Sequence, residues 1–329
     1  MIRQLAKPSF KSGFTITELM IALVLSTFLV GGVLSVYLSN VRTNQVTTMM
    51  SQAQQSSQIS FQLITRDVQH AGFTGCGNMI SERVVNVLRI TAADWWAHWN
   101  QFGGTTAYAG LQGYESGSVP SFVGSGITPV SGTDAMRMMY GRGISASVVN
   151  HVLTNNPPLT INNNTPGFKR NDIVVACDSK MAAIFQITDV AGNNLSHAVN
   201  VGTPGNNSNN FGFGVNGVTI PQALTPDAGM IVPLESMAWF VGLQNGESSL
   251  YRASLVGNKI EPEMVLAGVE DLEIQYLQVS HSNYVDANAV AAWEDVVAIR
   301  VTIVMKNDSQ TPMPIEMRTI SQVINLRNH

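Results

Sequence analysis

The 329-residue chain is 45% hydrophobic but only 12% charged, and its 22 acidic residues outnumber its 18 basic ones. This balance argues against broad nucleic-acid binding through a basic surface. The length is sufficient to bury a sizeable core and exceeds that of one small domain.

The N-terminal 38 residues combine a basic leader with a long uncharged segment. Arg3, Lys7 and Lys11 precede Gly13 with no acidic residue among them, and Leu19–Leu38 carries no charge. A helix of about 20 residues spans ~30 Å, the thickness of the hydrocarbon core of a bilayer. Because basic flanks stay in the cytoplasm, we expect one pass through a membrane, with the C-terminal domain outside the cytoplasm. A cleaved secretory signal is the alternative, but its apolar core would be shorter.

Glu18 is a single carboxylate at the edge of this apolar segment. A buried carboxylate costs up to ~2.5–3.5 kcal/mol at the centre of a bilayer and less near the interface. Glu18 either reaches water among the headgroups or needs a cationic partner within the membrane. Cleavage between Gly13 and Phe14 would create such a cation, the new α-ammonium group of Phe14.

Residues 13–23, GFTITELMIAL, resemble the prepilin signature of type IV pilins and type II secretion pseudopilins. The resemblance implies that a prepilin peptidase cleaves after Gly13 and that Phe14 is then N-methylated. It also implies that Glu18 contacts the amino terminus of a neighbouring subunit during filament assembly. Cleavage leaves 15 Lys and Arg against 22 Asp and Glu, because residues 1–13 contain three of the 18 basic residues and no acidic one.

A second apolar stripe follows the membrane segment at helical spacing. It consists of Val46, Met50, Ala53, Ser57, Phe61, Ile64, Val68 and Ala71. We therefore predict one continuous helix from about Thr15 to Ala71, ended by Gly72. The stripe needs a cover, either a sheet of the same chain or a coiled-coil partner. Unlike many major pilins, the membrane segment has no proline; Gly31-Gly32 either softens the helix locally or lets another helix approach closely.

Later segments predict a β-rich domain. Short apolar or alternating runs indicate strands at 173–176, 182–190, 237–243, 250–255, 272–279, 297–303 and 315–326. Asn245-Gly246, between two such runs, predicts a hairpin. Segments 103–132, 154–167 and 192–217 are predicted to be loops, the last a mobile surface insertion.

These patterns predict an α+β, pilin-like fold in which a long N-terminal helix packs on an antiparallel β-sheet. The expected organisation is a basic leader (1–13), the transmembrane half of the helix (14–38) and its amphipathic half (39–72). An exported β-rich globular pilin domain with long Asn/Gly-rich loops (73–329) completes the chain.

The chain has two cysteines, Cys76 and Cys177. In an oxidising compartment an even number favours a disulfide, which here would close a loop of about 100 residues; two free buried thiols are the alternative. No cysteine or histidine spacing predicts a metal site.

Patterns typical of enzymes are weak. The GxGxxG letters at 212–217 have no convincing strand before them or helix after them, and the six histidines are scattered. We predict no catalytic activity, cofactor or metal. Trp95, Trp96 and Trp99 indicate either a packed aromatic cluster or an exposed contact surface.

Two further stretches extend the resemblance. Residues 66–76 resemble the end of the long helix in PilW-type minor pilins, and 266–276 with 296–305 resemble the C-terminal strands of that group, whereas 77–265 carry no specific likeness. The resemblance implies a structural subunit that helps to prime type IV pilus assembly. It implies that the subunit is first a single-pass inner-membrane protein with a periplasmic C-terminal domain. It then joins a minor-pilin complex at the fibre tip, which is exposed at the cell surface.

The partners implied by the resemblance are the prepilin peptidase, other minor pilins, the major pilin, the inner-membrane assembly platform and a tip adhesin. No nucleic acid is expected. Two alternatives remain: a J-type pseudopilin of a type II secretion system, and a membrane-anchored adhesin or binding protein that uses the tryptophan segment.

Overall fold

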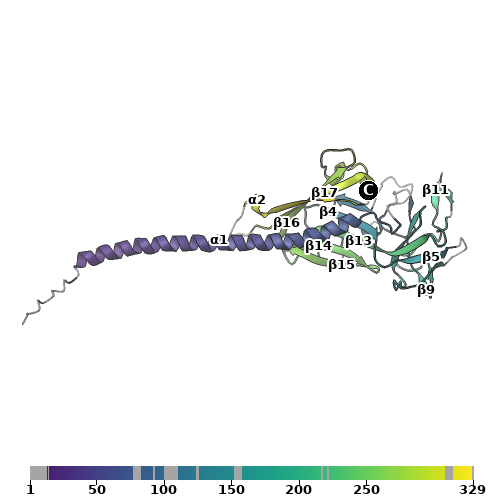
Figure 1. Cartoon of the computed structure of the whole chain (residues 1–329), viewed down its shortest axis with the longest axis horizontal. Coiled ribbons are helices and arrows are strands. Elements are labelled where there is room, and N and C mark those ends of the chain that lie inside the picture. The colour runs from purple at the N-terminus through teal and green to yellow at the C-terminus, as the bar shows by residue number, and fades with distance from the viewer. Residues whose placement is uncertain are drawn as a thin grey trace, which may run out of the picture.

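The computed structural model describes residues 13, 15–76, 83–91, 93–99, 110–123, 126–151, 158–215, 218–220, 222–307 and 314–327. Phe14 and the leader before Gly13 lie outside these residues, so the expectations placed on them stay predictions. A long helix, α1 (Ile16–His70), projects from a β-rich head (Figure 1). The predicted α+β class is confirmed.

α1 has 55 residues, which corresponds to ~80 Å of helix. Thr15 is its N-cap, and the helix runs without interruption through Gly31-Gly32. Ala71 is the C-cap, and Gly72 follows with a positive φ of 82°, a conformation that glycine adopts without steric cost. The predicted bounds are therefore right within one residue, whereas the glycine pair does not break the helix.

The head contains three sheets in the described part of the chain. The largest comprises β1 (Val84–Asn86), β2 (Leu111–Tyr114), β3 (Thr128–Pro129), β4 (Ala135–Gly141), β5 (Ala146–His151), β6 (Leu159–Ile161), β7 (Ile173–Cys177), β8 (Ala182–Gln186), β9 (Asp189–Ala191), β10 (Asn194–Ser196), β13 (Gly229–Gln244), β14 (Glu247–Val256) and β15 (Lys259–Ala267). The others are a pair, β11 (Phe213–Val215) and β12 (Val218–Ile220), and a three-stranded sheet of β16 (Val269–Gln278), β17 (Val296–Met305) and β18 (Thr319–Asn325). Short helices are η2 (Trp95–Ala97), η3 (Ala287–Ala289), η4 (Trp293–Asp295) and α2 (Ile315–Arg318).

The long strand β13 connects two lobes of the head. Its first residues, 229–233, pair with β5 and β7, and its later residues, 234–244, pair with β4, β3 and β14. We call the part around β5–β10 the distal lobe and the part around β2, β4, β14–β18 the proximal lobe. The distal lobe lies at the end of the molecule farthest from the start of α1 (Figure 1). All pairings are antiparallel among the described strands except that of β1 with β8.

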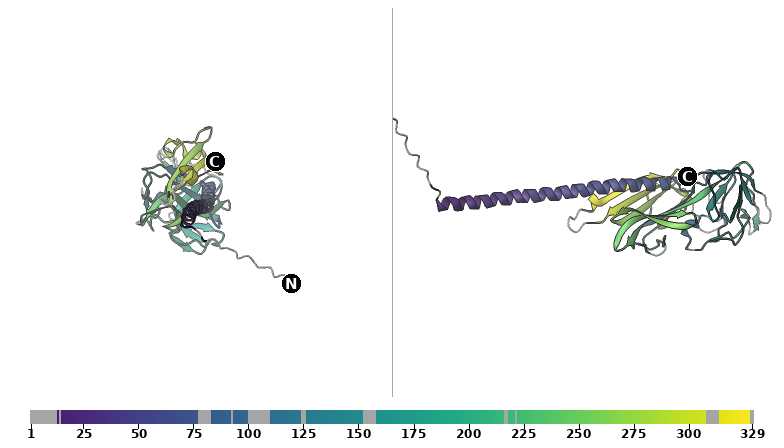
Figure 2. Two further views of the ribbon diagram at one scale, coloured as in Figure 1. Left: turned by 90° about the vertical axis from the view of Figure 1, so that its left-hand side faces the viewer. Right: turned by 90° about the horizontal axis from the view of Figure 1, so that it is seen from below.

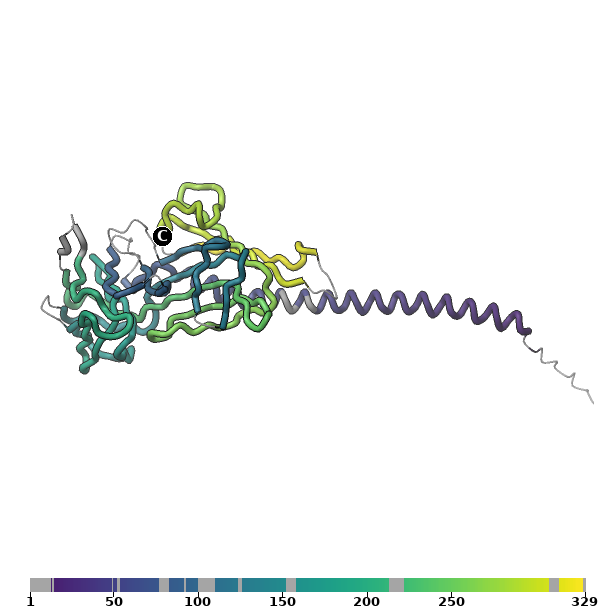
Figure 3. The backbone as a smooth tube through the Cα atoms, turned by 180° about the vertical axis from the view of Figure 1, so that it is seen from behind, coloured from purple at the N-terminus to yellow at the C-terminus, as the bar shows by residue number. Residues whose placement is uncertain are grey.

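The amphipathic half of α1 packs into the proximal lobe. Ser57, Phe61, Ile64, Val68 and Ala71 of the predicted stripe are all buried. The four apolar ones, Phe61 to Ala71, share one core with the inner faces of the β4–β13–β14 strands and of the β16–β17–β18 sheet. Seen from behind, the strands of the proximal lobe lie across the end of α1 (Figure 3). Full burial of a large apolar side chain stabilises by ~1.5–3 kcal/mol, so Phe61, Ile64 and Val68 fix this part of the helix on its own head.

The predicted hairpin is confirmed: β13 and β14 are joined by Asn245 and Gly246, both with positive φ. The predicted strands at 173–176, 250–255, 272–279 and 297–303 are also present, whereas 182–190 is divided between β8 and β9 and 315–326 begins with the turn of α2.

Three loop predictions are wrong in part. Strands β2 and β3 lie within 103–132, β6 lies within 154–167, and β10 and β11 lie within 192–217. Residues 103–109, 124–125, 154–157 and 216–217 are outside the described residues. These strands have only two to four residues, too few for a periodic pattern. Pairing with other strands stabilises them, and β2, β3 and β6 each pair with a longer strand.

Candidate assembly site

The N-terminus of α1 is closed by a reciprocal capping box. The backbone N–H of Thr15 donates to Oε2 of Glu18 at 3.0 Å, and the N–H of Glu18 donates to Oγ1 of Thr15 at 3.3 Å. The Thr15 hydroxyl also donates to Glu18 at 2.9 Å. The carboxylate of Glu18 thus satisfies a free donor of the first turn and lies at the positive end of the helix dipole. Gly13 has no atoms within 4 Å of the place where a Cβ would lie.

The first half of α1 is not buried by any other described part of the chain. Every side chain of residues 15–40 is exposed, and Phe28 is 77% exposed. Ile16–Thr48 is long and apolar enough to cross a membrane by length and composition. Figure 2 shows this half extending away from the head. An apolar helix surface that is exposed over this length is typical of a segment that contacts lipid or other helices.

A buried carboxylate locks the other end of α1 to the head. Asp67 is fully buried, and its oxygens accept from Nε of Arg252 at 2.7 Å, Nε1 of Trp239 at 3.1 Å and the hydroxyl of Tyr140 at 3.3 Å. These partners come from β14, β13 and β4. We call Asp67, Tyr140, Trp239 and Arg252 the helix lock.

The electrostatics of the helix lock favour a charged pair. Burial alone would lower the pKa of Arg252, but the hydrogen bonds and charge of Asp67 outweigh it and raise the pKa. Burial and the neighbouring Asp67 charge raise the pKa of Tyr140, so its hydroxyl stays a donor. These residues were not predicted from the sequence. The indication that the sequence offers is an acidic residue directly beside Val68 of the buried stripe.

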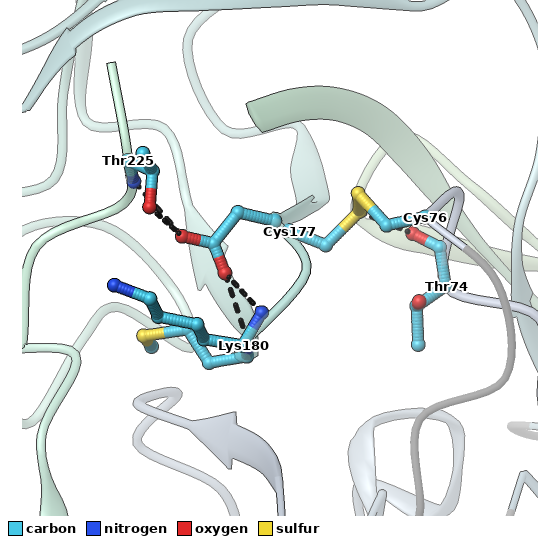
Figure 4. Close-up of a disulfide and its surroundings, with 7 residues drawn as sticks. Thr74, Cys76, Cys177, Lys180 and Thr225 are labelled. Carbon is cyan, nitrogen blue, oxygen red and sulfur yellow. Dashed lines mark hydrogen bonds between the residues drawn. A yellow bond between two sulfur atoms is a disulfide. The ribbon is translucent and has the colours of Figure 1, made fainter. Parts of the chain in front are cut away.

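The expected disulfide between Cys76 and Cys177 is present, with the two Cα atoms 5.9 Å apart. It joins the segment that follows α1 to the end of β7 (Figure 4). The adjacent Asp178 accepts from the Thr225 hydroxyl at 2.8 Å and from the backbone N–H groups of Lys180 and Met181. Burial would raise the pKa of Asp178, but these hydrogen bonds lower it overall.

The tryptophan segment does not form a contact surface. Trp95, Trp96 and Trp99 are 4%, 7% and 3% exposed. Trp95 donates its indole N–H to the carbonyl of Phe122 at 2.9 Å and packs edge-to-face on that ring. The exposed-surface interpretation was wrong because η2 and the residues directly after it place all three rings in the core of the head.

No group of three or more His, Cys, Asp or Glu side chains able to hold a metal occurs among the described residues. The GxGxxG letters fall on β11 and the residues after it, with β12 following instead of a helix; residues 216–217 are not described.

Residues 238–323 match the model of a protein family described as type IV pilus-assembly protein W, PilW. Over these residues the chain is similar to PilW-type pilus proteins. No curated protein and no solved structure matches the chain. The matched PilW segment runs from the middle of β13 into β18 and contains Trp239 and Arg252 of the helix lock. The likeness predicted for 266–276 and 296–305 falls inside this match, whereas 66–76 lies outside it.

Proposed function

We propose that this PilW-type chain is a minor pilin, a structural subunit without catalytic activity that helps to prime type IV pilus assembly. Its place is a minor-pilin complex at the fibre tip. One observation carries the proposal: an uncovered apolar helix is held firmly by a head of the PilW type. A helix that is complete, capped and exposed along 15–40 is ready to pack among equivalent helices.

Before assembly, the subunit resides in the inner membrane. The apolar half of α1 lies in lipid, with the basic leader in the cytoplasm and the head in the periplasm. The prepilin peptidase cleaves after Gly13, and Phe14 is N-methylated. Assembly then exchanges lipid contacts of the helix for helix–helix packing in the fibre, which is exposed at the cell surface.

Cleavage changes the surroundings of Glu18. In the uncleaved chain its carboxylate accepts from the backbone N–H of Thr15. The ammonium group that cleavage creates on a neighbouring subunit offers a full positive charge, and a charge-assisted hydrogen bond is about twice as strong as a neutral one. Glu18 therefore favours packing next to a processed subunit.

The partners that follow from this function are the prepilin peptidase, the other minor pilins, the major pilin and the inner-membrane assembly platform, with a tip adhesin above the complex. The PilW match favours a pilus over the J-type pseudopilin of a secretion system. The alternative of an anchored binding protein loses its proposed surface, because the three tryptophans are buried.

Substitution of Glu18 tests the proposal. Glu18→Ala should be processed normally but recovered in sheared fibres at a much lower level than the unchanged protein. The matched control is Glu247→Ala, which removes an exposed carboxylate paired only with Lys306 at 3.1 Å on the head surface. Equal recovery of both variants would contradict the assembly role of Glu18.

A further inference from the structure

A groove of about 620 Å³ lies between α1 and β18. One wall is Gln58, Gln62, Thr65 and Arg66 of the helix, and the other includes Ile320 and Gln322 of the strand. The C-terminal yellow strands lie beside α1 in Figures 1 and 2. The volume is within the ~300–1,000 Å³ range of protein binding clefts. Neither the membrane half of α1 nor the helix lock forms these walls.

The strand wall presents an open sheet edge. Among the described strands β18 pairs with β17 alone. The N–H of Leu326 donates to the carbonyl of Val297 opposite it at 2.9 Å, just beyond the pair Ala298–Asn325. Hydrogen-bonded pairs alternate along an antiparallel ladder. The backbone groups of Ser321 and Val323 therefore point away from β17, towards the open edge.

This edge lacks the features that keep edge strands from pairing. Thr319–Asn325 contains no proline and no charge, and Val323 is 50% exposed. Two other long strands, β15 and β16, also lie at sheet edges; β15 carries Glu261, Pro262 and Glu263 in succession, and β16 carries three acidic residues, Glu270, Asp271 and Glu273. Charges and proline are the common devices that block strand addition. β15 is thus protected, whereas β18 is open to an added strand.

The helix wall offers hydrogen-bonding groups at the same groove. Gln58, Gln62 and Thr65 recur at helical spacing, next to the buried stripe. A glutamine amide both donates and accepts, so it complements a peptide backbone. The hydroxyl oxygen of Thr65 is buried and has no hydrogen-bond partner among the described residues. An extended segment in the groove would have polar partners on both sides.

One end of the groove is basic, in a chain of net charge −4. Burial and the nearby Arg142, Arg327 and Arg66 lower the pKa of His70, against a smaller opposing effect of Asp67. Asp67 is paired with Arg252 at 2.7 Å and also with Arg66 at 3.4 Å, and Arg142 pairs with Glu235 at 3.7 Å. Arg327 is exposed. The four arginines Arg66, Arg142, Arg252 and Arg327 thus outnumber the two carboxylates, Asp67 and Glu235, that pair with them. This excess of positive charge favours an occupant with carboxylates.

We propose that the groove binds an extended acidic segment of a neighbouring pilus subunit, which adds as a strand to β18 and directs its carboxylates towards Arg66 and Arg327. The identity of the neighbour rests on the proposed minor-pilin function. The strand-addition site itself rests on the open edge, the polar helix wall and the charge at its end.

Site-specific photocrosslinking in fibre-forming cells tests the site. A benzophenone amino acid replaces Gln322 in the groove or, as the matched control, Val33 in the exposed half of α1. We expect position 322 to crosslink to a sister subunit, within a peptide of net negative charge identified by mass spectrometry. Crosslinks from 33 but none from 322, or a basic peptide at 322, would overturn the groove and leave the proposed function intact. Crosslinks to a sister subunit from neither position would contradict the proposed function itself.

Two substitutions, each made in the chain that carries the benzophenone amino acid at position 322, distinguish strand addition from a contact that involves no strand pairing. Val323→Pro removes the outward N–H without touching the ladder to β17, whereas Val323→Ala keeps it. We expect the proline variant to lose about tenfold in crosslink yield and the alanine variant to stay near the unchanged protein. Equal yields from a folded proline variant would refute strand addition. Arg327→Glu, an exposed change that spares the fold, should also lower the yield severalfold, and an unchanged yield would refute the acidic occupant.

Discussion

Replacing the buried carboxylate of the helix lock should detach α1 from the head. Asp67→Asn keeps the shape of the side chain but removes the charge that faces Arg252, whose side chain is only 11% exposed. The guanidinium group is then left buried without its counter-ion. We expect the free energy of unfolding to fall while the membrane half of α1 is unaffected.

The size of the effect follows from the contacts. Asp67 accepts from Arg252, Trp239 and Tyr140, all within 3.3 Å. Breaking a buried ion pair by removing one partner costs ~3–5 kcal/mol, a large share of the ~5–15 kcal/mol that holds a typical protein folded. By contrast, the partly exposed Arg142–Glu235 pair should contribute less than ~1 kcal/mol.

Urea unfolding of the full chain in detergent micelles, followed by tryptophan fluorescence, measures this difference. Glu235→Gln is the matched control, because it neutralises a carboxylate of a surface pair. A double-mutant cycle with Arg252→Gln should show that the two losses are not additive, since each variant removes the same pair. If Asp67→Asn unfolded within ~0.5 kcal/mol of the control, the helix lock would not hold the helix.

Two further predictions concern the rest of the head. Replacing Cys76 and Cys177 together by alanine should lower the free energy of unfolding by up to ~4.7 kcal/mol, because the bridge closes a loop of about 100 residues. If a thiol reagent labelled the native protein before reduction, the disulfide would be contradicted. Burial lowers the pKa of His151 and of His197 from 6.5 to about 4. The unfolded chain therefore binds protons more readily, so stability is full above pH 6.5 and falls by up to ~3 kcal/mol per histidine as the pH drops towards 4. The urea midpoint should fall over this range and should fall less in His197→Leu; a midpoint independent of pH would refute the buried neutral pair.

Local patterns were sufficient to predict the helix and the hairpin. The stripe that ends with Phe61, Ile64, Val68 and Ala71 repeats at the helical period, and all four side chains are buried. Asn245-Gly246 provides the positive φ values that a two-residue turn needs. The disulfide could be predicted from an even number of cysteines together with the expectation that the chain is exported.

The helix lock could not be predicted in this way. Asp67 is 73, 172 and 185 residues away in sequence from Tyr140, Trp239 and Arg252. Only the pairing of β4, β13 and β14 brings those three side chains to one place. The presence of an acid beside the buried stripe indicates a partner but does not identify it.

The Asn/Gly-rich segment 192–217 shows why composition can mislead. Asn206 is fully buried, its Oδ1 accepts from the N–H of Gln186 at 2.8 Å, and its Nδ2 donates to the carbonyl of Gln186 at 2.9 Å. The side-chain amide thus takes the place of a neighbouring strand at Gln186. Such a residue looks like a loop former in the sequence, yet here it packs into the distal lobe.

In the proposed function, a subunit cleaved after Gly13 joins the fibre through the exposed half of α1. Intact-mass and N-terminal peptide analysis of the protein in sheared fibres measures this directly. We expect a chain that begins at an N-methylated Phe14 and is recovered with other pilins. A chain that begins at Met1 and stays in the membrane fraction would contradict it.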